Sequence, residues 1–293
     1  MELATSLNVF FDGVVDPEQA IRRCAAAGFR ALDFNYCDHQ KYLLGQTWSV
    51  EEAWAQRLRA VAEDSGAHFV QMHGPMFNKF GAGGEHEALL ALCGRSLQTA
   101  QILGVPWVVL EPETSAGAFD AAQHQFLLEQ NAAFVRRLLP VAERGGIGIA
   151  LENLPDSGAR SRGARRWYGA VPEELIELVD ALDHPLVGVC WDTGHAQLQA
   201  LNQGQALCAI GGRLKALHIQ DNDGVSDQHL LPFHGAVDWP ALMGALFAIS
   251  YPGAFTYEVH RAIRVLPDAL RGAALHYAYA VGTFLLESRD HQA

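Results

Sequence analysis

The sequence predicts an α/β protein built as one closed barrel of eight parallel strands, each followed by a helix. Three observations favour this fold. Short apolar segments alternate with helical segments along the whole chain, a glycine follows several of the predicted helices, and ionisable residues stand where predicted strands end. The chain has 293 residues, of which 49% are hydrophobic and 18% charged, so it can bury a large core. We therefore expect residues 1–293 to form a single barrel domain.

Eight short segments rich in aliphatic, β-branched and aromatic residues are the predicted strands. In chain order they are Ala4–Phe10, Ala31–Tyr36, His68–His73, Trp107–Glu111, Gly148–Asn153, Val187–Asp192, Lys215–Gln220 and Ala254–His260. The predicted helices are Pro17–Ala27, Val50–Ser65, Glu85–Leu103, Asp120–Arg144, Pro172–Leu182, Gln205–Gly211, Trp239–Ile249 and Pro267–Leu286. An open doubly wound sheet is the alternative, but no predicted strand leads into a GxGxxG motif or a phosphate-binding loop.

Composition narrows the classes of function. The formal net charge is −12, which argues against a general nucleic-acid-binding surface but is compatible with one local basic cleft. No segment approaches the length of a membrane span, and we expect no signal peptide at the first residues. The five cysteines are scattered and form no CxxC motif, which predicts reduced thiols and a cytoplasmic protein.

Ionisable side chains follow the predicted strands at the end where barrels of this kind carry their active sites. Those of strands five to eight are Glu152, Asp192, His218 and Glu258. Several carboxylates buried near one axis are unfavourable unless a cation balances them. Three carboxylates and one imidazole suit Mn²⁺, Mg²⁺, Co²⁺ or Zn²⁺. The sequence therefore predicts a divalent-metal site, although any one of these residues alone could instead cap a helix or form an ion pair.

Four motifs around these residues resemble those of the xylose isomerase-like TIM barrels. They are ALEN, WDTGHA, HIQDND…DQHLLPFHGAVDW and YEVH, and the resemblance extends from about the first strand to the last helix. More narrowly, the chain resembles the sugar phosphate isomerase/epimerase group, which shares its fold with endonuclease IV-type apurinic endonucleases. The resemblance implies metal ligands at the same four residues. It also implies an acid/base pair at Glu152 and Glu258 and a substrate contact at His195.

The resemblance implies a metal-dependent isomerase or epimerase of a sugar or sugar phosphate, which transfers a proton next to a carbonyl through an enediolate. A metal-dependent polyol or inosose dehydratase is an alternative, because it uses similar residues. A zinc phosphodiesterase acting on abasic DNA is another. In the endonuclease branch His195, Asp227 and His229 would hold an additional metal and His73 would bind a further one, but Glu111 stands where that branch has a histidine. Homo-oligomers are common in the family, so a homo-oligomer is expected.

Further residues are expected to contact the substrate; they are His73, His229, Arg160 and Arg261. Arg160 begins an arginine-rich segment, RSRGARRWYG, in an acidic chain, and arginine binds phosphate or carboxylate well. Trp167 and Tyr168 could stack on a sugar ring or a base, whereas a solvated loop whose charges balance nearby acids is the alternative. After His218, we expect Asp221 and Asp223 to fix the loop or orient the ligands, and Asp238 to cap the following helix.

Overall fold

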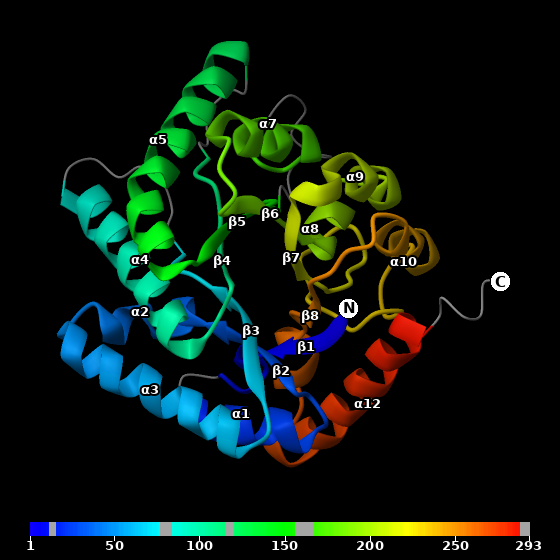
Figure 1. The fold of residues 1–293 in the computed structure, drawn as a ribbon. Helices are drawn as coiled ribbons and strands as arrows, with labels where there is room; N and C mark the ends of the chain where they lie inside the picture. Colours follow the sequence, from blue (N-terminus) through cyan, green and yellow to red (C-terminus); the bar gives the residue numbers. More distant parts are fainter. Residues whose placement is uncertain (12–15, 77–83, 115–119, 156–166, 288–293) are drawn as a thin grey trace.

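The computed structural model describes residues 1–11, 16–76, 84–114, 120–155 and 167–287, which form eight parallel strands surrounded by helices (Figure 1). The strands are β1 (Glu2–Ser6), β2 (Ala31–Asn35), β3 (His68–His73), β4 (Trp107–Leu110), β5 (Gly148–Glu152), β6 (Val187–Asp192), β7 (Leu214–His218) and β8 (Ala254–Tyr257). Their order in the sheet is β7-β6-β5-β4-β3-β2-β1-β8. A bridge between Ile219, directly after β7, and Tyr257 of β8 joins the two ends. The predicted TIM barrel is confirmed.

The helices lie outside the strands (Figure 1). They are α1 (Pro17–Ala26), α2 (Tyr36–Leu43), α3 (Trp48–Asp64), α4 (Gly84–Leu103), α5 (Ala121–Gly145), α7 (Pro172–Leu182), α8 (Thr193–Leu198), α9 (Gln203–Ile210), α10 (Trp239–Ala248), α11 (His260–Arg264) and α12 (Asp268–Glu287). The sequence did not predict the short helices α2, α8 and α11. The predicted first strand also ends early, because Leu7–Phe10 forms a 3₁₀ turn. All four residues of that turn are buried, and a short apolar run does not reveal which backbone it adopts.

On the inner side of the barrel, strands β4 to β7 carry a small apolar cluster below their ionisable ends. Alternate residues of a strand point inward, so Gly148, Ala150 and Glu152 of β5 stack along the barrel axis. A Cβ atom on Gly148 would lie 2.2 Å from the indole of Trp107, which therefore occupies that space. Above it, Val109, Ala150, Cys190 and Ala216 form a small buried cluster. The strand ends, with their ionisable residues, lie on top of this apolar layer.

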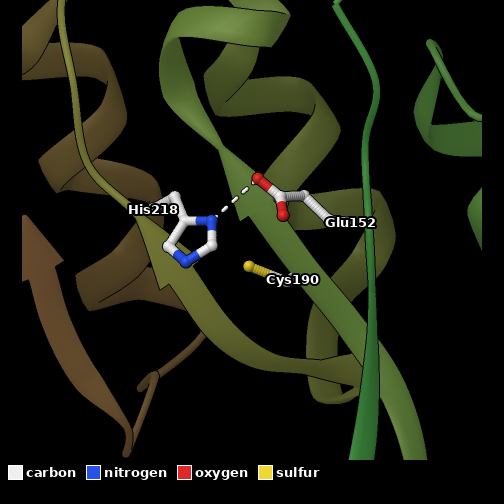
Figure 2. Close-up of side chains that lie close together, drawn as sticks. All are labelled: Glu152, Cys190 and His218. Atoms are coloured by element: carbon white, nitrogen blue, oxygen red, sulfur yellow. Dashed lines mark hydrogen bonds and ion pairs between the residues drawn. The ribbon is translucent and has the colours of Figure 1, made fainter. Parts of the chain in front are cut away.

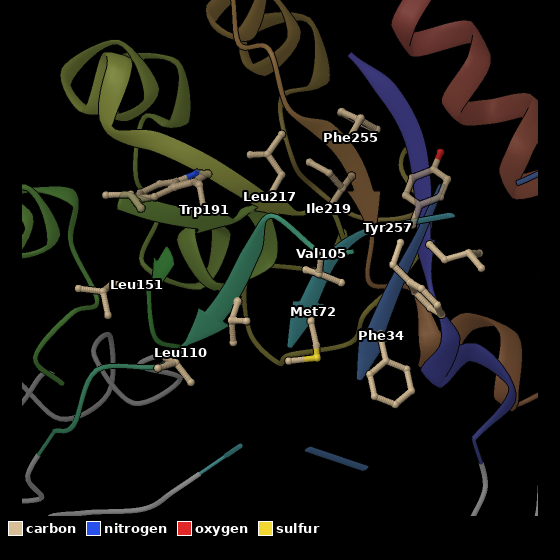
Figure 3. Packing of buried hydrophobic residues seen from close by; sticks show 14 of the residues in the cluster. Phe34, Met72, Val105, Leu110, Leu151, Trp191, Leu217, Ile219, Phe255 and Tyr257 are labelled. Carbon is tan, nitrogen blue, oxygen red and sulfur yellow. The ribbon is translucent and has the colours of Figure 1, made fainter. Parts of the chain in front are cut away.

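Large side chains fill the space between strands and helices and hold the strands in place. Figure 3 shows part of this core. Its labelled residues include Phe34, Met72, Leu151, Trp191 and Phe255, which all belong to one buried hydrophobic cluster. Burying one such side chain stabilises the fold by about 1.5–3 kcal/mol. In the described part of the chain, no helix has the length and apolar character needed to cross a membrane. The five cysteines all lie among the described residues and none is in a disulfide.

The loop between β7 and α10 is fixed by aspartates. The carboxylate of Asp221, fully buried, accepts hydrogen bonds from the backbone N–H groups of Asn222 and Val237 and from the indole N–H of Trp239. Asp223 accepts bonds from the two backbone N–H groups of residues 225 and 226. Asp238 caps α10 by accepting a bond from the backbone N–H of residue 241, as the sequence predicts. These bonds hold the loop that begins at His218.

Candidate metal centre and substrate cavity

The four predicted metal ligands meet at one end of the barrel. Glu152, Asp192 and His218 are the last residues of β5, β6 and β7, and Glu258 directly follows β8. Asp192 and His218 are paired across the β6–β7 register. One ligand atom of each residue lies within 4.8 Å of those of the other three, and all four residues are buried. The fold therefore gathers four side chains that are up to 106 positions apart in the sequence.

The closest contact in this cluster joins His218 to Glu152. The imidazole Nδ1 lies 2.7 Å from Glu152 Oε1 and 4.0 Å from Glu258 Oε2, and Figure 2 shows Cys190 of β6 close to this pair. Burial by itself would raise the pKa of Glu152, but the imidazoles of His218 and His73 outweigh it and bring the pKa to about 2. Glu152 is therefore ionised at neutral pH.

Several buried polar atoms around His218 have no hydrogen-bond partner among the described residues. They include Glu152 Oε2, His218 Nε2 and both carboxylate oxygens of Asp33. Asp33 is an inward-facing residue of β2, is fully buried, and has its Oδ2 3.7 Å from His218 Nε2. Buried carboxylates without partners are costly unless positive charge lies nearby. The three carboxylate ligands and the His218 imidazole therefore form a set of groups that fits a divalent cation. Asp33 lies on the far side of the imidazole, where it can orient the ring.

His195 and His73 lie at the edge of this cluster. His195 Nδ1 is 2.7 Å from the carbonyl oxygen of Asn153, and 3.8 Å from carboxylate oxygens of both Glu152 and Asp192. A carbonyl only accepts, so Nδ1 carries a hydrogen. Burial would lower the pKa of His195, but Asp192 and the neighbouring carboxylates raise it to about 9. His73 Nε2 lies 3.7 Å from Glu152 Oε2. Both histidines therefore stand where they can donate hydrogen bonds into the site.

The predicted Asp227–His229 pair is formed. His229 Nε2 lies 2.8 Å from Asp227 Oδ2, and His229 Nδ1 lies 2.9 Å from the backbone carbonyl oxygen of Glu258. Both partners only accept hydrogen bonds, so both nitrogens of His229 donate. Burial would lower the pKa of His229, but Glu258 and Asp227 outweigh it and raise the pKa. His195 lies nearby, with its ring centroid 6.4 Å from that of His229, so the three residues of the predicted second site are also brought together.

A cavity of about 260 Å³ opens above the cluster. Predicted site residues in its wall are His73, Glu152, His195, Asp227, His229, Glu258 and Arg261. Glu111 also lines it, and burial raises the pKa of its carboxyl group. The cavity thus joins the candidate metal ligands to the histidines predicted to contact the substrate.

Sequence reasoning missed several residues of the site. Asn8, Cys37, Asp38 and His260 line the same cavity. Cys37 and Asp38 follow β2 just as the predicted site residues follow the other strands, so the strand-end pattern contained a signal for them. The position of Asp33 within an apolar strand was a further signal.

Of the arginines predicted to bind the substrate, the structure describes Arg261 but not Arg160. Arg261 and Arg264 of α11 line the cavity, and their guanidinium groups donate to the backbone carbonyls of Asp227 and Phe11 respectively. Arg160, together with the three arginines after it, lies outside the described residues. The side chain of Tyr168 is fully buried in the core, so the expected stacking of Tyr168 on a sugar ring is wrong. The adjacent Trp167 is 38% exposed.

The closed barrel, with buried carboxylates and imidazoles at its strand ends, is a TIM barrel whose candidate site lies at the carboxyl ends of the strands, where proteins of this fold carry their active sites. Residues 21–277 match the family described as xylose isomerase-like TIM barrel, and the chain belongs to this family. The resemblance seen in the motifs is thereby confirmed.

Curated relatives include one of unknown and one of known activity. The uncharacterized protein y4fM of Sinorhizobium fredii is 30% identical over 212 residues, which are 71% of this chain and 65% of y4fM. A 2-epi-5-epi-valiolone 7-phosphate 2-epimerase of an Actinoplanes species is 31% identical over 107 residues, which are 36% of this chain and 38% of that protein. The chain spans less than two thirds of the length of the curated relatives that it matches.

Solved structures share the whole fold. A D-tagatose 3-epimerase-like protein has a TM-score of 0.75 and 20% identity, with 100% of this chain and 99% of that chain covered. The IOLI protein with a bound zinc atom has a TM-score of 0.77 and 17% identity, with 99% of each chain covered. The structural neighbours therefore include sugar epimerases and a zinc-binding barrel, and at these identities the likeness establishes the fold.

Proposed function

We propose that this chain is a divalent-metal-dependent isomerase or epimerase of a small sugar or sugar phosphate. The observation that carries the proposal is the position of Glu152 and Glu258, which belong to one four-residue cluster and both line one cavity. Two carboxylates beside one substrate can remove a proton from carbon and return one to another face or to the neighbouring carbon. The epimerase among the curated relatives and those among the structural neighbours support this assignment.

The proposed cation is Mn²⁺, Mg²⁺, Co²⁺ or Zn²⁺, held by Glu152, Asp192, His218 and Glu258. When bound, it supplies positive charge beside a substrate oxygen, where negative charge develops during proton removal. The low pKa of Glu152 keeps this carboxylate ionised at neutral pH, as a metal ligand must be. Glu258, which directly follows β8, is the proposed second proton carrier.

The remaining wall of the cavity would bind and orient the substrate. His73, His195 and His229 are proposed to donate hydrogen bonds to its hydroxyl groups. Arg261 stands at the cavity wall with one guanidinium nitrogen bonded to the carbonyl of Asp227, which leaves its other donors for a phosphate or carboxylate group. Arg160, which lies outside the described residues, is proposed as a further substrate contact because arginine binds phosphate or carboxylate well.

The contacts of His229 favour a single metal site over two. Both of its nitrogens donate to protein acceptors, Asp227 and the carbonyl of Glu258. A metal held by His195, Asp227 and His229 would need an imidazole nitrogen without its hydrogen, and the raised pKa of His229 opposes this. The isomerase proposal needs the four-ligand site alone, whereas an endonuclease-like activity needs the additional metals.

Hydrogen exchange from solvent tests the proposal directly. The purified full chain, loaded with Mn²⁺ or Zn²⁺, is incubated in D₂O with ketoses, aldoses and their phosphates, and deuterium at carbon is measured by NMR. Glu152→Gln and Glu258→Gln are each expected to lower the exchange rate about 10²- to 10⁴-fold while the fold is retained. Glu129→Gln, at an exposed position on α5, is the matched control and should exchange at the normal rate.

Metal removal provides the second measurement. Chelation followed by dialysis should abolish exchange, and adding the divalent ion back should restore it. Exchange that persists after verified metal removal, or in both glutamate variants, would refute the proposal. A product lighter by one water molecule would instead identify the dehydratase alternative, and cleavage of abasic duplex DNA would identify the phosphodiesterase.

A further inference from the structure

The cavity wall beside Glu258 carries a histidine that lies outside the four-ligand set. His260 is the first residue of α11, is half-buried and lines the cavity. One of its ring nitrogens lies within 4.8 Å of a carboxylate oxygen of Glu258 and of a nitrogen of His229. Its ring rests against that of His229, with 4.1 Å between the ring centroids. His260 is therefore close to the carboxylate that is the proposed second proton carrier.

Asn8 determines which nitrogen of His260 carries the hydrogen. The amide Nδ2 of Asn8 lies 3.2 Å from Nδ1 of His260. An amide nitrogen only donates, so Nδ1 of His260 accepts this bond and has no hydrogen of its own. The ring hydrogen is then on Nε2. The contact with Asn8 thus selects the neutral imidazole with an Nε2–H group.

The side chain of Asn8 is itself held in this orientation. Its Oδ1 accepts a hydrogen bond from the hydroxyl group of Ser6, so that Nδ2 is directed at His260. The backbone N–H of Asn8 donates to Oδ1 of Asn35 over 3.0 Å. Both Ser6, at the end of β1, and Asn8, in the 3₁₀ turn Leu7–Phe10, are buried. Two residues at the start of the chain therefore fix the hydrogen of a histidine near its end.

The Nε2–H group of His260 is available to a bound molecule. In the part of the chain that the structure describes, it has no hydrogen-bond partner. His229 differs, because both of its nitrogens donate to protein acceptors, so it can reach a substrate only by giving up one of these bonds. On this wall of the cavity, His260 therefore offers a donor without such a loss.

The positions of these hydrogens argue against a metal at this wall. The distances between their ligand atoms would allow His229, Glu258 and His260 to hold a cation. A metal binds an imidazole nitrogen that has no hydrogen. In His260 that nitrogen is Nδ1, which accepts from Asn8, and in His229 both nitrogens donate. The group is therefore better suited to bind an oxygen atom of a substrate than a metal ion.

We propose that His260 binds the substrate through its Nε2–H group, and that Ser6 and Asn8 are positioning residues that hold it in this tautomer. The inference rests on the proposed function and deepens it, because it specifies a feature of the substrate. The group that fits is a hydroxyl oxygen on the part of the sugar next to Glu258. A sugar that lacks this hydroxyl leaves the donor without a partner and is bound less well.

Nitrogen NMR tests the tautomer without any substrate. The full chain is labelled with ¹⁵N-histidine and loaded with Zn²⁺, and the signals of His260 are those lost in His260→Gln. In the wild type, Nδ1 should give the signal of a nitrogen without hydrogen and Nε2 that of a nitrogen with one. Asn8→Asp replaces the donor with an acceptor and should place a hydrogen on Nδ1. A hydrogen on Nδ1 in the wild type, or unchanged signals in Asn8→Asp, would overturn the positioning role.

Kinetics test the substrate contact, with the sugar that exchanges deuterium fastest in the D₂O assay. His260→Phe should lower kcat/KM about 10-fold, mainly by raising KM, and should leave the metal affinity unchanged. His260→Gln keeps an N–H donor and should recover part of this loss. His276→Phe, the same substitution at an exposed position of α12, should behave like the wild type. A thermal melt checks folding, and His260→Leu replaces His260→Phe if the latter does not fold.

Monodeoxy analogues of that sugar identify the hydroxyl. With the wild type, one analogue should lose about 10-fold in kcat/KM, whereas His260→Phe should hardly distinguish this analogue from the parent sugar. Full activity of His260→Phe, a loss of its metal affinity, or undiminished discrimination among the analogues would overturn the contact. A wild type that exchanges no sugar would overturn the proposed function and the substrate contact with it, while the NMR result would still decide the role of Asn8.

Discussion

Replacing Asp33 with asparagine is expected to weaken metal binding without destabilising the metal-free protein. Asp33 is fully buried, and neither carboxylate oxygen has a hydrogen-bond partner among the described residues. Among the residues that the structure describes, the cationic group that lies close to Asp33 is the His218 imidazole, whose Nε2 is 3.7 Å from Asp33 Oδ2. If Nδ1 of His218 holds a cation, Nε2 carries the hydrogen and points it toward Asp33, which orients the ring.

The size of the effect follows from this separation. Two full charges 3.7 Å apart interact by about 4–5 kcal/mol at an effective dielectric constant of about 20. A metal-bound imidazole carries part of a charge, so the loss should be smaller. We expect the metal dissociation constant to rise about 10- to 100-fold, which is the usual effect of removing a group that orients a metal-bound histidine. The metal-free protein should keep or gain stability, because a buried carboxylate without hydrogen bonds has been neutralised.

Two measurements separate this reasoning from a purely structural role. Competition with a chelator gives the affinity for Mn²⁺ or Zn²⁺, and a thermal melt gives the stability of the metal-free protein. Asp64→Asn, which makes the same change in net charge at the exposed end of α3, should alter neither quantity. Unchanged metal affinity in Asp33→Asn would refute the orienting role, and a large loss of stability without metal would show that Asp33 supports the fold instead.

Two further predictions concern stability. Burial lowers the pKa of His39 to about 4, so between about pH 6.5 and pH 4 the unfolded chain binds a proton that the folded chain does not, and stability falls as the pH falls. Between pH 7 and pH 5, the free energy of unfolding measured in urea should fall by up to about 2 kcal/mol more in the wild type than in His39→Phe. Equal decreases in the two proteins would contradict this prediction. Asp221→Ala removes the carboxylate that accepts hydrogen bonds from the indole of Trp239 and from two backbone N–H groups. It should lower the free energy of unfolding by about 2–4 kcal/mol. A melting temperature close to the wild-type value would instead show that water replaces those bonds.

The fold was predictable because strand and helix patterns alternate without interruption and the predicted strands end in ionisable residues. Three predicted ligands, Glu152, Asp192 and His218, are indeed the last residues of their strands. The short helices were not predictable in the same way. Each of α2, α8 and α11 starts one to three residues after a strand end and has only 8, 6 and 5 residues respectively, which is too short for a helical period to stand out.

The parts of the site that the sequence did not reveal depend on contacts across the barrel. Asp33 lies on β2 and His218 on β7, strands that are not neighbours in the sheet. Nothing in the local pattern of either strand indicates that the two side chains meet, since that depends on the closure and stagger of the whole barrel. The same holds for Asn8 and His260, whose side chains lie 3.2 Å apart although 252 positions separate them.

The apolar layer below the strand ends has a direct consequence for the chemistry above it. Ala150, Cys190 and Ala216 are buried directly beneath the level of Glu152, Asp192 and His218, two positions earlier on the same strands. Their small apolar side chains offer no polar group to the strand ends from below, which lowers the local dielectric constant on this side of the barrel. Electrostatic interactions there are stronger than at a solvated surface, and this is the setting in which fixed charges can stabilise a developing negative charge most effectively. Small side chains one layer below the ligands are therefore as much a part of the proposed site as the ligands themselves.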